Sequence, residues 1–583
     1  MIYFDAMNNP LLQVNNLTTI FRSGDGVFKA VNDISFDLCS REVLGVAGES
    51  GSGKSVTALS IMQLMKSPSM KVSSGNIIYN NGAAVNLLQL DAKGQQAYRG
   101  KEIAMIFQEP MTSLNPVITC GKQVSEAMCL HLQVTKKEAR EKTMYLFKRV
   151  KLPQPESIYD CFPHQLSGGQ KQRAMIAMAI SCNPKILIAD EPTTALDVTV
   201  QASLIELLKE LQQETGMSII FITHDLGILS QIADRVLVMH NGCIIEQGAV
   251  EQVFKNPVHP YTKGLLSCRP SLFNNKERLP VIEDFMDTSP NANVAKEHNS
   301  QEDSRIDEFR NNASEQKKDI YITPPFISVR NLSVSYSRSN GFLRQSKEIV
   351  RAVDDISFDI YKGETLGLVG ESGCGKTTLG KALLNMVKST GSVMFKGKNI
   401  SSLSVDDMRP LRKNMQMIFQ DPYASLNPRL TIGEAIMEPM LVHSIGNSVT
   451  ERKENALLLL EKVGLKSQHF KRYPHEFSSG QRQRIAIARA LALSPEFIIC
   501  DECVSSLDVS VQAQVLNLIN ELKCELGFTT IFISHDLSVV RYMSDRIMVM
   551  NNGKIVELGD ATEVYQHPKS EYTRMLIDAI PVI

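Results

Sequence analysis

The sequence lacks any excess of positive charge. Its 62 lysine and arginine residues are balanced by 63 aspartate and glutamate residues, for a formal net charge of -1. A protein that binds nucleic acid through a general electrostatic surface carries a clear basic excess. The composition therefore argues against nucleic acid as a partner, although a local basic patch would not show in these totals.

Long apolar runs are also missing. Stretches such as residues 219–222 have the length of a strand, and none approaches the roughly 20 residues that span a bilayer. The first residues, 1–5, lack the basic start and apolar run of a signal peptide. We therefore expect the protein to be made and kept in the cytoplasm.

Cysteine is too sparse for a disulfide scaffold, with 11 in 583 residues. Cys500 and Cys503 have CxxC spacing, which is one pattern of metal or redox sites. An acidic pair stands between them, however, and the first half of the chain has Ala189 and Pro192 at the matching positions. Apolar filling beside the acidic pair is the alternative that we favour.

A long internal repeat dominates the sequence. Lys376 in the second half corresponds to Lys54 in the first. Each lies in a glycine-rich loop, and the same short motifs follow it in the same order. A length of 583 residues suits two to four domains, each with its own core. The repeat therefore indicates a duplicated domain, and any site in the first half is expected again in the second.

Each half alternates strand and helix patterns, which predicts an α/β fold. In each half the second strand has alternating apolar residues, as expected for a sheet with one solvated face. The predicted strands are residues 11–17, 30–36, 43–47, 185–189 and 218–223 in the first half, with 326–332, 352–358 and 365–369 as counterparts. Residues 139–150 predict a helix.

Residues 284–320 differ in composition from the rest. They are rich in Asn, Ser, Glu, Asp and Lys and nearly lack aromatics, which is typical of a disordered linker. About 37 such residues reach about 30–35 Å on average, enough for two domains to meet face to face. We predict a first domain at 1–270 with a tail from about 256, a linker at 271–325, and a second domain at 326–583 with a tail from about 565.

Two loops carry the GxxxxGK[ST] pattern between a buried strand and a helix, where it indicates phosphate binding. Glycines let the backbone wrap phosphate, and backbone amides at a helix start supply positive potential. Lys54 and Lys376 are expected to reach the β- and γ-phosphates, and the hydroxyls of Ser55 and Thr377 to ligate Mg²⁺. The loops are Gly48, Glu49, Ser50, Gly51, Ser52, Gly53, Lys54 and Ser55, and Gly370, Glu371, Ser372, Gly373, Cys374, Gly375, Lys376 and Thr377.

An acidic pair follows an apolar strand in each half. Asp190 and Asp501 end their strands, where a carboxylate can contact Mg²⁺ through water. Glu191 and Glu502 come next and are predicted to face the other way along the strand. Phosphoryl transfer depends mainly on positioning, so these glutamates are our candidates for polarising the attacking water.

A histidine follows a later apolar strand in each half. His224 and His535 stand at the same separation from their glutamates, which favours a γ-phosphate contact over a structural role. Gln108 and Gln420 lie between the glycine loop and the acidic pair. We assign them to the ATP site and to the Mg²⁺ ligands.

A further loop makes the pattern specific. It comprises Ser167, Gly168, Gly169 and Gln170 in the first half, and Ser478, Ser479, Gly480 and Gln481 in the second. With this signature ahead of the acidic pair, most of each half resembles the nucleotide-binding domains of ATP-binding cassette (ABC) proteins. The resemblance implies two P-loop NTPase domains, each with a mostly parallel sheet, an antiparallel β part and a helical subdomain.

In that family the signature of one domain caps the ATP held by the other, and the signature loop is itself a helix start that can face an anion. The resemblance therefore implies an intramolecular head-to-tail dimer. Lys54 would work with Ser478 and Gly480, and Lys376 with Ser167 and Gly169. Asp197 and Asp508, which follow the acidic pairs, are also placed among the ATP-binding residues.

Adenine is expected to stack on an aromatic ring near the end of the first strand. Phe21 and Tyr336 resemble the family's stacking residues, and Phe28 is a rival for Phe21. Ordinary core packing is the other interpretation of these rings.

Two differences separate the halves. Ser479 stands where the family usually has glycine, and serine would be strained there if the position needed a positive φ; we therefore expect the Lys54 site to be the weaker. Cys374 lies in the second glycine loop near a helix start and Lys376, surroundings that lower a thiol pKa. Packing is its alternative role; as a hypothesis, alkylation would inactivate the second site and ATP would protect it.

The tails at 259–266 and 567–576, and the segments 108–116 and 420–428, resemble the ATPases of oligopeptide, dipeptide and nickel (glutathione-class) importers. The resemblance implies an ATP hydrolase that uses ATP and Mg²⁺ at the cytoplasmic face of a bacterial inner membrane. Its partners would be two transmembrane permease subunits and, indirectly, an extracytoplasmic substrate-binding protein. Specificity lies in those other subunits, so peptide or glutathione cargo is a hypothesis.

Soluble twin ATPases of translation or DNA repair are the alternative. Translation factors carry a charged helical linker, whereas this linker contains Ser289-Pro290 and runs of Asn and Ser that fit a helix poorly. Repair ATPases insert paired CxxC motifs, which this sequence lacks. The tail argues against a third possibility, an exporter.

Overall fold

The computed structural model describes residues 10–23, 26–65, 69–108, 113–194, 196–270, 278–286, 321, 323–339 and 347–580. The chain forms two compact units, Met1–Leu266 and Ser267–Ile580. Most of the predicted linker at 271–325 and part of the segment 108–116 lie outside the described residues. Among the residues described, no helix is both long and apolar enough to cross a membrane.

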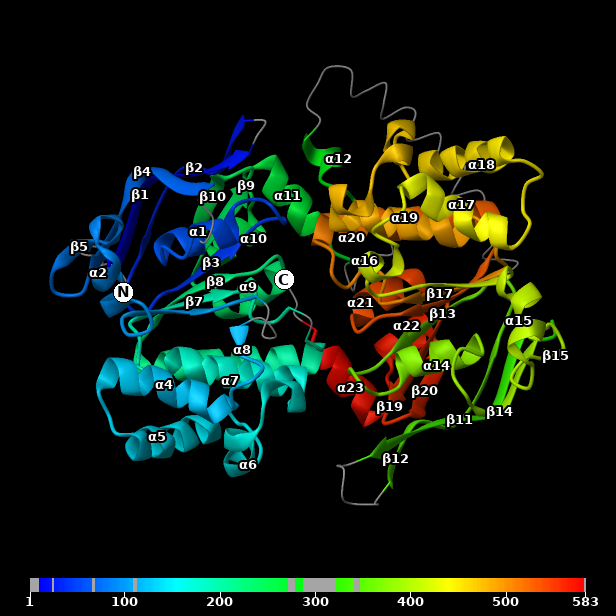
Figure 1. Cartoon of the computed structure of the whole chain (residues 1–583), viewed down its shortest axis with the longest axis horizontal. Helices are drawn as coiled ribbons and strands as arrows, with labels where there is room; N and C mark the ends of the chain where they lie inside the picture. Colours follow the sequence, from blue (N-terminus) through cyan, green and yellow to red (C-terminus); the bar gives the residue numbers. More distant parts are fainter. Residues whose placement is uncertain are drawn as a thin grey trace. The chain divides into compact units, whose positions relative to one another are not determined.

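Unit 1 contains two sheets (Figure 1). The six-stranded sheet has the order β10-β9-β3-β8-β7-β6, and the four-stranded sheet has the order β2-β1-β4-β5. The strands are β1 (Leu12–Ser23), β2 (Gly26–Leu38), β3 (Val43–Ala47), β4 (Met70–Asn80), β5 (Ala84–Asn86), β6 (Ile103–Ile106), β7 (Ile186–Asp190), β8 (Ser218–Ile222), β9 (Arg235–His240) and β10 (Cys243–Ala249).

The six-stranded sheet is the core of unit 1. Its strands β3, β7 and β8 are buried at every residue, as expected for parallel strands covered on both faces. All neighbours from β9 to β6 pair in parallel, and only the edge strand β10 runs antiparallel. This mostly parallel sheet confirms the predicted fold class.

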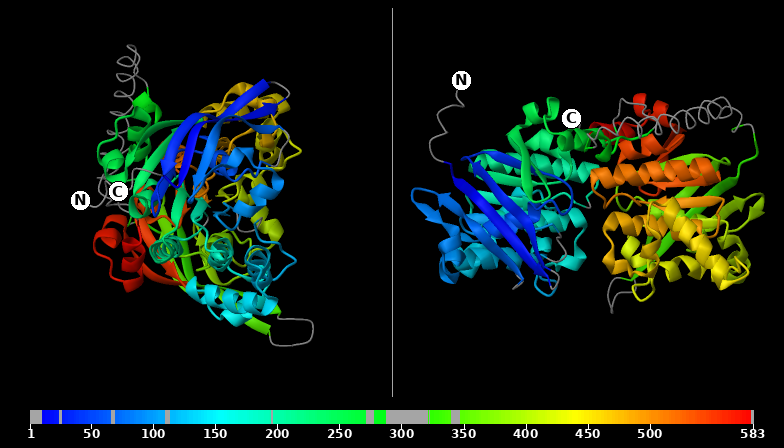
Figure 2. Two further views of the ribbon diagram at one scale, coloured as in Figure 1. Left: turned by 90° about the vertical axis from the view of Figure 1, so that its left-hand side faces the viewer. Right: turned by 90° about the horizontal axis from the view of Figure 1, so that it is seen from above.

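The four-stranded sheet is antiparallel and has one solvated face. Figure 2 shows its long strands β1, β2 and β4 side by side. From Ile34 to Leu38, buried and exposed residues alternate along β2, so the alternation in sequence correctly predicted a half-buried sheet.

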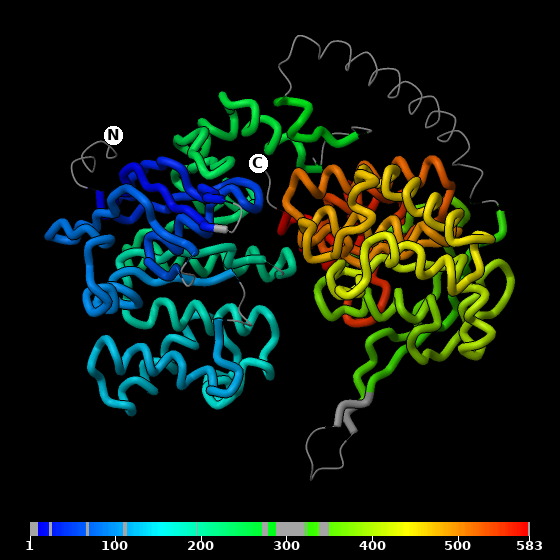
Figure 3. The backbone as a smooth tube through the Cα atoms, turned by 45° about the horizontal axis from the view of Figure 1, so that its top comes forward, coloured from blue at the N-terminus to red at the C-terminus, as the bar shows by residue number. Residues whose placement is uncertain are grey.

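Four helices form a layer of their own in unit 1 (Figure 3). They are α4 (Cys120–Leu132), α5 (Lys136–Arg149), α6 (Pro155–Asp160) and α7 (Gly168–Ile180). Helix α5, predicted at 139–150, begins three residues earlier because Thr135 and Glu138 form a capping box around its first turn. The remaining helices are α1 (Lys54–Ile61), α2 (Ala92–Tyr98), α8 (Val198–Thr215), α9 (Leu226–Ile232), α10 (Val250–Lys255) and α11 (Pro260–Ser267).

Unit 2 repeats this plan, with sheets β16-β17-β18-β13-β19-β20 and β12-β11-β14-β15. Its strands are β11 (Ile327–Ser339), β12 (Lys347–Ile360), β13 (Thr365–Val369), β14 (Thr390–Phe395), β15 (Lys398–Asn399), β16 (Met415–Ile418), β17 (Phe497–Asp501), β18 (Thr529–Ile533), β19 (Arg546–Asn551) and β20 (Lys554–Asp560). Its helices are α14 (Lys376–Leu383), α15 (Val405–Arg412), α16 (Pro422–Ser425), α17 (Ile432–Val442), α18 (Val449–Lys462), α19 (Ser479–Leu491), α20 (Val509–Leu526), α21 (Leu537–Met543), α22 (Ala561–Gln566) and α23 (Glu571–Asp578).

Within its described residues, unit 2 also has a segment at 278–286 that ends in the short helix α12 (Glu283–Met286). Asn517, a buried residue of α20, holds this segment by accepting from Leu279 N (3.0 Å) and donating to Leu279 O (2.8 Å). Gln514 of α20 donates to Glu283 (2.9 Å). In unit 1 the position of Asn517 in α8 is held by Glu206, which is exposed.

Candidate functional site

The predicted site residues of unit 1 gather at one edge of the parallel sheet. The glycine loop follows β3, Gln108 follows β6, Asp190 ends β7, and His224 follows β8. These strands are parallel, so their carboxyl ends meet at one edge, where α/β proteins bind ligands. The strand order thus brings together residues that are far apart in sequence.

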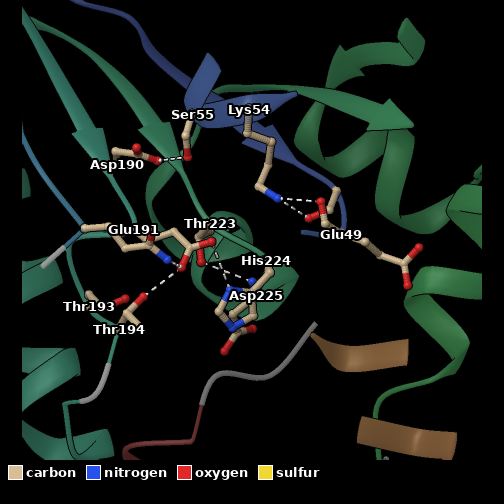
Figure 4. Close-up of polar contacts among 12 residues, drawn as sticks. Glu49, Lys54, Ser55, Asp190, Glu191, Thr193, Thr194, Thr223, His224 and Asp225 are labelled. Carbon is tan, nitrogen blue, oxygen red and sulfur yellow. Dashed lines mark hydrogen bonds and ion pairs between the residues drawn. The ribbon is translucent and has the colours of Figure 1, made fainter. Parts of the chain in front are cut away.

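The phosphate-loop lysine is held by its own loop (Figure 4). Lys54 is 5% exposed, and its ammonium donates to Gly48 O at 2.6 Å and to Glu49 O at 2.9 Å. Gly48 has φ 144°, and a Cβ on it would lie 2.3 Å from Met239 O. The loop path therefore requires glycine there, and it aims Lys54 before any phosphate arrives.

The second loop has the same construction. Lys376 donates to Gly370 O at 2.6 Å and to Glu371 O at 3.0 Å. Gly370 has φ 152°, and an added Cβ would lie 2.2 Å from Met550 O. The two phosphate loops are alike in backbone conformation despite the serine-to-cysteine difference inside them.

A hydroxyl and a carboxylate meet beside each loop. Ser55 donates to Asp190 at 3.0 Å, and Thr377 donates to Asp501 at 3.0 Å. Burial raises the pKa of Asp190 to about 6 and outweighs the opposing effect of Ser55; burial also raises the pKa of Asp501. Buried oxygen ligands that gain from a nearby cation suit Mg²⁺, so these residues fit that ion.

Glu191 leaves the line of its strand. The strand ends at Asp190, and Glu191 takes φ 47°, in the left-handed region, so the prediction that it simply faces the other way along the strand was wrong. The turn places its carboxylate beside three donors, one of which is Gln108 (2.9 Å). The other two, Thr194 (2.9 Å) and the Nδ1 of His224 (3.3 Å), are shown in Figure 4. Burial alone would raise the pKa of Glu191, but His224, Thr194 and Lys54 bring it to about 2, so the carboxylate stays ionised.

Glu502 has a similar but looser surrounding, with φ 46°. Gln420 donates to it at 2.7 Å, while His535 Nδ1 lies 3.8 Å away and Lys376 Nζ 3.9 Å away. Burial would raise the pKa of Glu502, but His535 and Lys376 outweigh burial and lower it. Ser505, the counterpart of Thr194, donates to the backbone oxygen of Glu502 rather than to its carboxylate.

The two glutamines therefore lie beside the glutamates. Gln108 and Gln420 each donate an amide N–H to a glutamate carboxylate. Their amide oxygens are then the atoms that a cation would take. Asp197 and Asp508 stand farther along the chain, at the residues immediately before α8 and α20.

Each signature loop begins a helix. Ser167 accepts from Gln170 N, and the Gln170 side chain accepts from Ser167 N, which is a capping box. Ser478 and Gln481 do the same before α19. The amides of the first helical turn therefore point out of each helix start, as anion binding requires.

The expected strain at Ser479 is absent, so that argument for a weaker Lys54 site was wrong. Ser479 is the first residue of α19 and is not among the positive-φ residues. The matching glycine, Gly168, has only Leu196 within 4 Å of an added Cβ. The crowded position is the next one, where a Cβ on Gly480 would lie 2.3 Å from Val511 Cγ1.

The candidate adenine-stacking rings lie on the antiparallel sheets. Phe21 is directly opposite Phe28 in the β1–β2 ladder, and Phe28 is 63% exposed. Tyr336 is opposite Val350 in the β11–β12 ladder and is 46% exposed. Phe28 and Tyr336 thus present aromatic surface to solvent, so simple core packing does not explain them.

Cys374, Cys500 and Cys503 are buried. A side-chain hydrogen bond to Cys500, together with burial, raises the pKa of the Cys503 thiol well above its usual value. Among the described residues no group of three or more His, Cys, Asp or Glu side chains is arranged to hold a metal. Burial of Cys374 also limits access of a modifying reagent to the second loop.

Several contacts were not anticipated from the sequence. Thr194 reaches the Glu191 carboxylate, and Gln172 of α7 donates to Pro192 O at 2.6 Å. Tyr261 and Tyr572, in the tails, touch the glycine loops. The recurrence of the tyrosines at matching places in the repeat was the one available signal, since contacts across more than 200 residues leave no local pattern.

Comparison with known families matches both halves. Residues 31–194 and 353–505 match the family described as ABC transporter. Residues 245–292 and 556–583 match the family described as oligopeptide/dipeptide transporter, C-terminal region. Residues 161–230 also match an AAA domain described as a putative AbiEii toxin of a type IV toxin–antitoxin system.

Similar proteins cover nearly the whole chain. The sequence is 46% identical over 580 residues to the glutathione import ATP-binding protein GsiA of Salmonella paratyphi A, with 98% of this chain and 90% of the relative covered. It is 44% identical over 576 residues to GsiA of Pectobacterium atrosepticum, with the same coverage. For GsiA of Escherichia coli K12 the identity is 45% over 588 residues, covering 99% of this chain and 90% of the relative.

Proposed function

Because the chain belongs to the ABC transporter ATP-binding proteins, in the group of the glutathione import ATP-binding proteins, we propose that it powers glutathione uptake. Its role as the ATP-hydrolysing, energy-coupling subunit of a glutathione or peptide importer follows from that membership. Identity of 44–46% over 576–580 residues, which cover 98% of this chain, is the observation that supports glutathione as the cargo. The resemblance recognised in the sequence is thereby confirmed, and nothing supports the soluble translation or repair alternative.

The ATP-site residues have separate tasks in this proposal. Lys54 and Lys376, already aimed by their loops, bind the β- and γ-phosphates. Glu191 and Glu502 stay ionised at neutral pH, so each can accept a hydrogen bond from the attacking water. The neighbouring glutamines and histidines fix the carboxylate oxygens, which is the positioning on which phosphoryl transfer depends.

The proposed metal is Mg²⁺. Ser55 with Asp190 and Gln108, and Thr377 with Asp501 and Gln420, would hold one ion in each half. When bound, Mg²⁺ neutralises charge on the phosphate oxygens. Removal of divalent cations with EDTA is expected to abolish ATP turnover, measured as phosphate release, and Mg²⁺ is expected to restore it.

Two composite sites complete the proposed cycle. The signature at Ser478 and Gly480 would cap ATP on Lys54, and the signature at Ser167 and Gly169 would cap ATP on Lys376. ATP then favours the closed arrangement, because it contacts both halves only there. The capping boxes, which start α7 and α19 with their amides pointing outward, support this role.

The partners of an import ATPase are membrane permeases. We propose two permease subunits, an extracytoplasmic binding protein that delivers the cargo, and peripheral attachment at the cytoplasmic face of the inner membrane. The segments 108–116 and 420–428 would contact the permeases. This arrangement lets ATP-driven closing of the two halves move both permease subunits together.

Uptake of labelled glutathione tests the proposal. Cells that make the chain together with its proposed permease and binding-protein subunits are expected to accumulate glutathione, and the double variant Glu191→Gln/Glu502→Gln is expected not to. Accumulation of a dialanine or nickel probe without glutathione would leave the ATPase role and overturn the cargo. Absence of uptake, with turnover stimulated by ribosomes or DNA, would favour the soluble alternative.

A further inference from the structure

The tail helices place a tyrosine against each phosphate loop. Tyr261 in α11 is completely buried, and its hydroxyl accepts from Glu49 N at 3.2 Å. Tyr572 in α23 accepts from Glu371 N at 3.1 Å. Both helices lie beyond the stretches that match the ABC transporter family and inside those that match the transporter C-terminal region. The same contact in both halves indicates a selected geometry.

The contacted loop residue is held from both sides. Glu49 N donates to Tyr261, while Glu49 O accepts from the Lys54 ammonium at 2.9 Å. Tyr261 also donates to the Glu49 carboxylate at 3.3 Å. A continuous chain of hydrogen bonds therefore runs from the tail through one loop residue to the phosphate-binding lysine.

Unit 2 contains the same chain of contacts. Glu371 N donates to Tyr572, and Glu371 O accepts from the Lys376 ammonium at 3.0 Å. The preceding residue, Gly370, has φ 152°, so this part of the loop has a backbone conformation that side chains rarely support. An external hydrogen bond that fixes the next amide limits how far this flexible point can move.

Each tail is itself anchored to the sheet edge. Glu246 of β10 accepts from Val258 N at 2.8 Å and His259 N at 3.1 Å. In unit 2, Glu557 of β20 accepts from Lys569 N at 2.9 Å and Ser570 N at 3.1 Å. The start of each tail is thus fixed to the sheet, and the tyrosine hydroxyl occupies a set position.

The first tyrosine has one additional support. The ring of His240 packs on the ring of Tyr261, with 4.2 Å between the centroids and 39° between the planes. In unit 2 the strand corresponding to β9 ends with Asn551 instead. The hydroxyl contact is therefore the feature that both halves share.

We propose that Tyr261 and Tyr572 are positioning residues of the two ATP sites. Each hydroxyl holds the amide after the first loop glycine, so the loop carbonyls keep the lysine ammonium aimed at the phosphates. Without the hydroxyl, a partly buried amide loses this hydrogen bond, and the loop gains freedom before ATP binds. This inference rests on the proposed assignment of the glycine loops as the ATP-binding sites.

Tyrosine-to-phenylalanine variants of the full chain test the proposal one loop at a time. Equilibrium binding of radiolabelled ATP is measured in Lys376→Ala, which leaves the first loop, with and without Tyr261→Phe. The reciprocal pair is Lys54→Ala with and without Tyr572→Phe. We expect about tenfold weaker ATP binding from each phenylalanine, as for loss of one hydrogen bond of about 1.4 kcal/mol.

A matched control separates positioning from stability. Tyr79, in β4 of the antiparallel sheet, is also buried, and its hydroxyl donates to Glu102 at 2.8 Å. Tyr79→Phe is expected to leave ATP affinity unchanged. Melting temperatures are measured for all variants, and binding is compared at a temperature where every variant is folded.

The outcomes are distinct. ATP affinity within twofold of the parent in Tyr261→Phe and Tyr572→Phe, or an equal loss in Tyr79→Phe, would overturn the positioning role. The parent is expected to bind two ATP per chain and each lysine variant one. If the lysine variants still bound two, the loop assignment itself would fail, and that failure is visible before any tyrosine is changed.

Discussion

Among single residues, the two candidate catalytic glutamates have an unusual backbone conformation. Glu191 and Glu502 have φ near +47°, a conformation uncommon for a residue with a side chain. Such outliers persist where the surroundings determine them and are common at functional sites. Here the turn carries the carboxylate away from the strand line and into reach of Gln108 or Gln420.

This geometry predicts the effect of removing the carboxylate charge. Glu191→Gln and Glu502→Gln keep the side-chain length but lose the acceptor for the attacking water. Each is expected to reduce ATP turnover on the order of 10²-fold or more, measured as phosphate release from the purified chain. Parental turnover in either single variant would remove that glutamate from the mechanism.

The signature glycines differ in how much space they have. A Cβ at Gly480 would lie 2.3 Å from Val511, whereas a Cβ at Gly168 meets nothing closer than 4.0 Å. Gly480→Ala is therefore expected to destabilise the protein by about 1–3 kcal/mol through overpacking, measured by urea unfolding. Gly168→Ala is the control, with little change in the unfolding midpoint; equal effects would contradict the packing argument.

Among the secondary-structure elements, the starts of α5 and α17 each hold a glutamate in a capping box. Thr135 N and Thr431 N donate to the carboxylates of Glu138 and Glu434, and these bonds, with the threonine hydroxyls, lower the pKa of both glutamates. A lowered pKa in the folded state contributes stability above the usual value of 4.5, and that stability is lost as the pH falls through the folded value.

Thr135→Ala with Thr431→Ala should therefore weaken this pH dependence. The parent is expected to lose more melting temperature between pH 6 and pH 4 than the double variant, because the variant retains fewer contacts that lower the glutamate pKa values. Melting curves at the two pH values measure the difference. An identical loss in parent and variant would show that other groups control the acid response.

Elements were easier to predict from sequence than contacts. The core strands at 43–47, 185–189 and 218–223 were predicted to within one residue, because fully buried strands appear as apolar runs bounded by polar residues. The left-handed turn at Glu191 has no such signal, since two of the three donors around its carboxylate, Gln108 and His224, follow other strands. The strain expected at Ser479 was inferred from the glycine that the family usually has there, and only the helix start revealed that serine fits.

For the molecule as a whole, the proposed composite sites predict how the effects of two substitutions on ATP binding combine. Lys54→Ala and Ser478→Arg, which places an arginine in the second signature, would each remove a contact to the same ATP. Their effects on ATP trapping are expected to be non-additive, whereas Lys54→Ala with Ser167→Arg should remove both sites. Trapped nucleotide per chain in a Glu191→Gln/Glu502→Gln background measures this. Additive loss in the first pair would contradict the head-to-tail arrangement.

The contacts of the segment 278–286 with α20 predict how fast proteases cleave that segment. Asn517→Glu places in α20 the residue that α8 has, and removes both backbone contacts to Leu279. Protease cleavage within 278–286 is expected to accelerate at least several-fold, because a released segment exposes its backbone. Asn447→Glu, a change at an exposed position of unit 2, is the control; equal cleavage in both variants would mean that Asn517 does not hold the segment.

Docking of the segment 278–286 shortens the free linker between the two halves. If the segment stays bound, the connecting chain runs from Leu266 to Arg278 instead of continuing to Phe326. At about 3.3–3.6 Å per residue, the maximum length of this linker falls from roughly 200 Å to roughly 40 Å. A shorter linker raises the effective concentration of one half near the other.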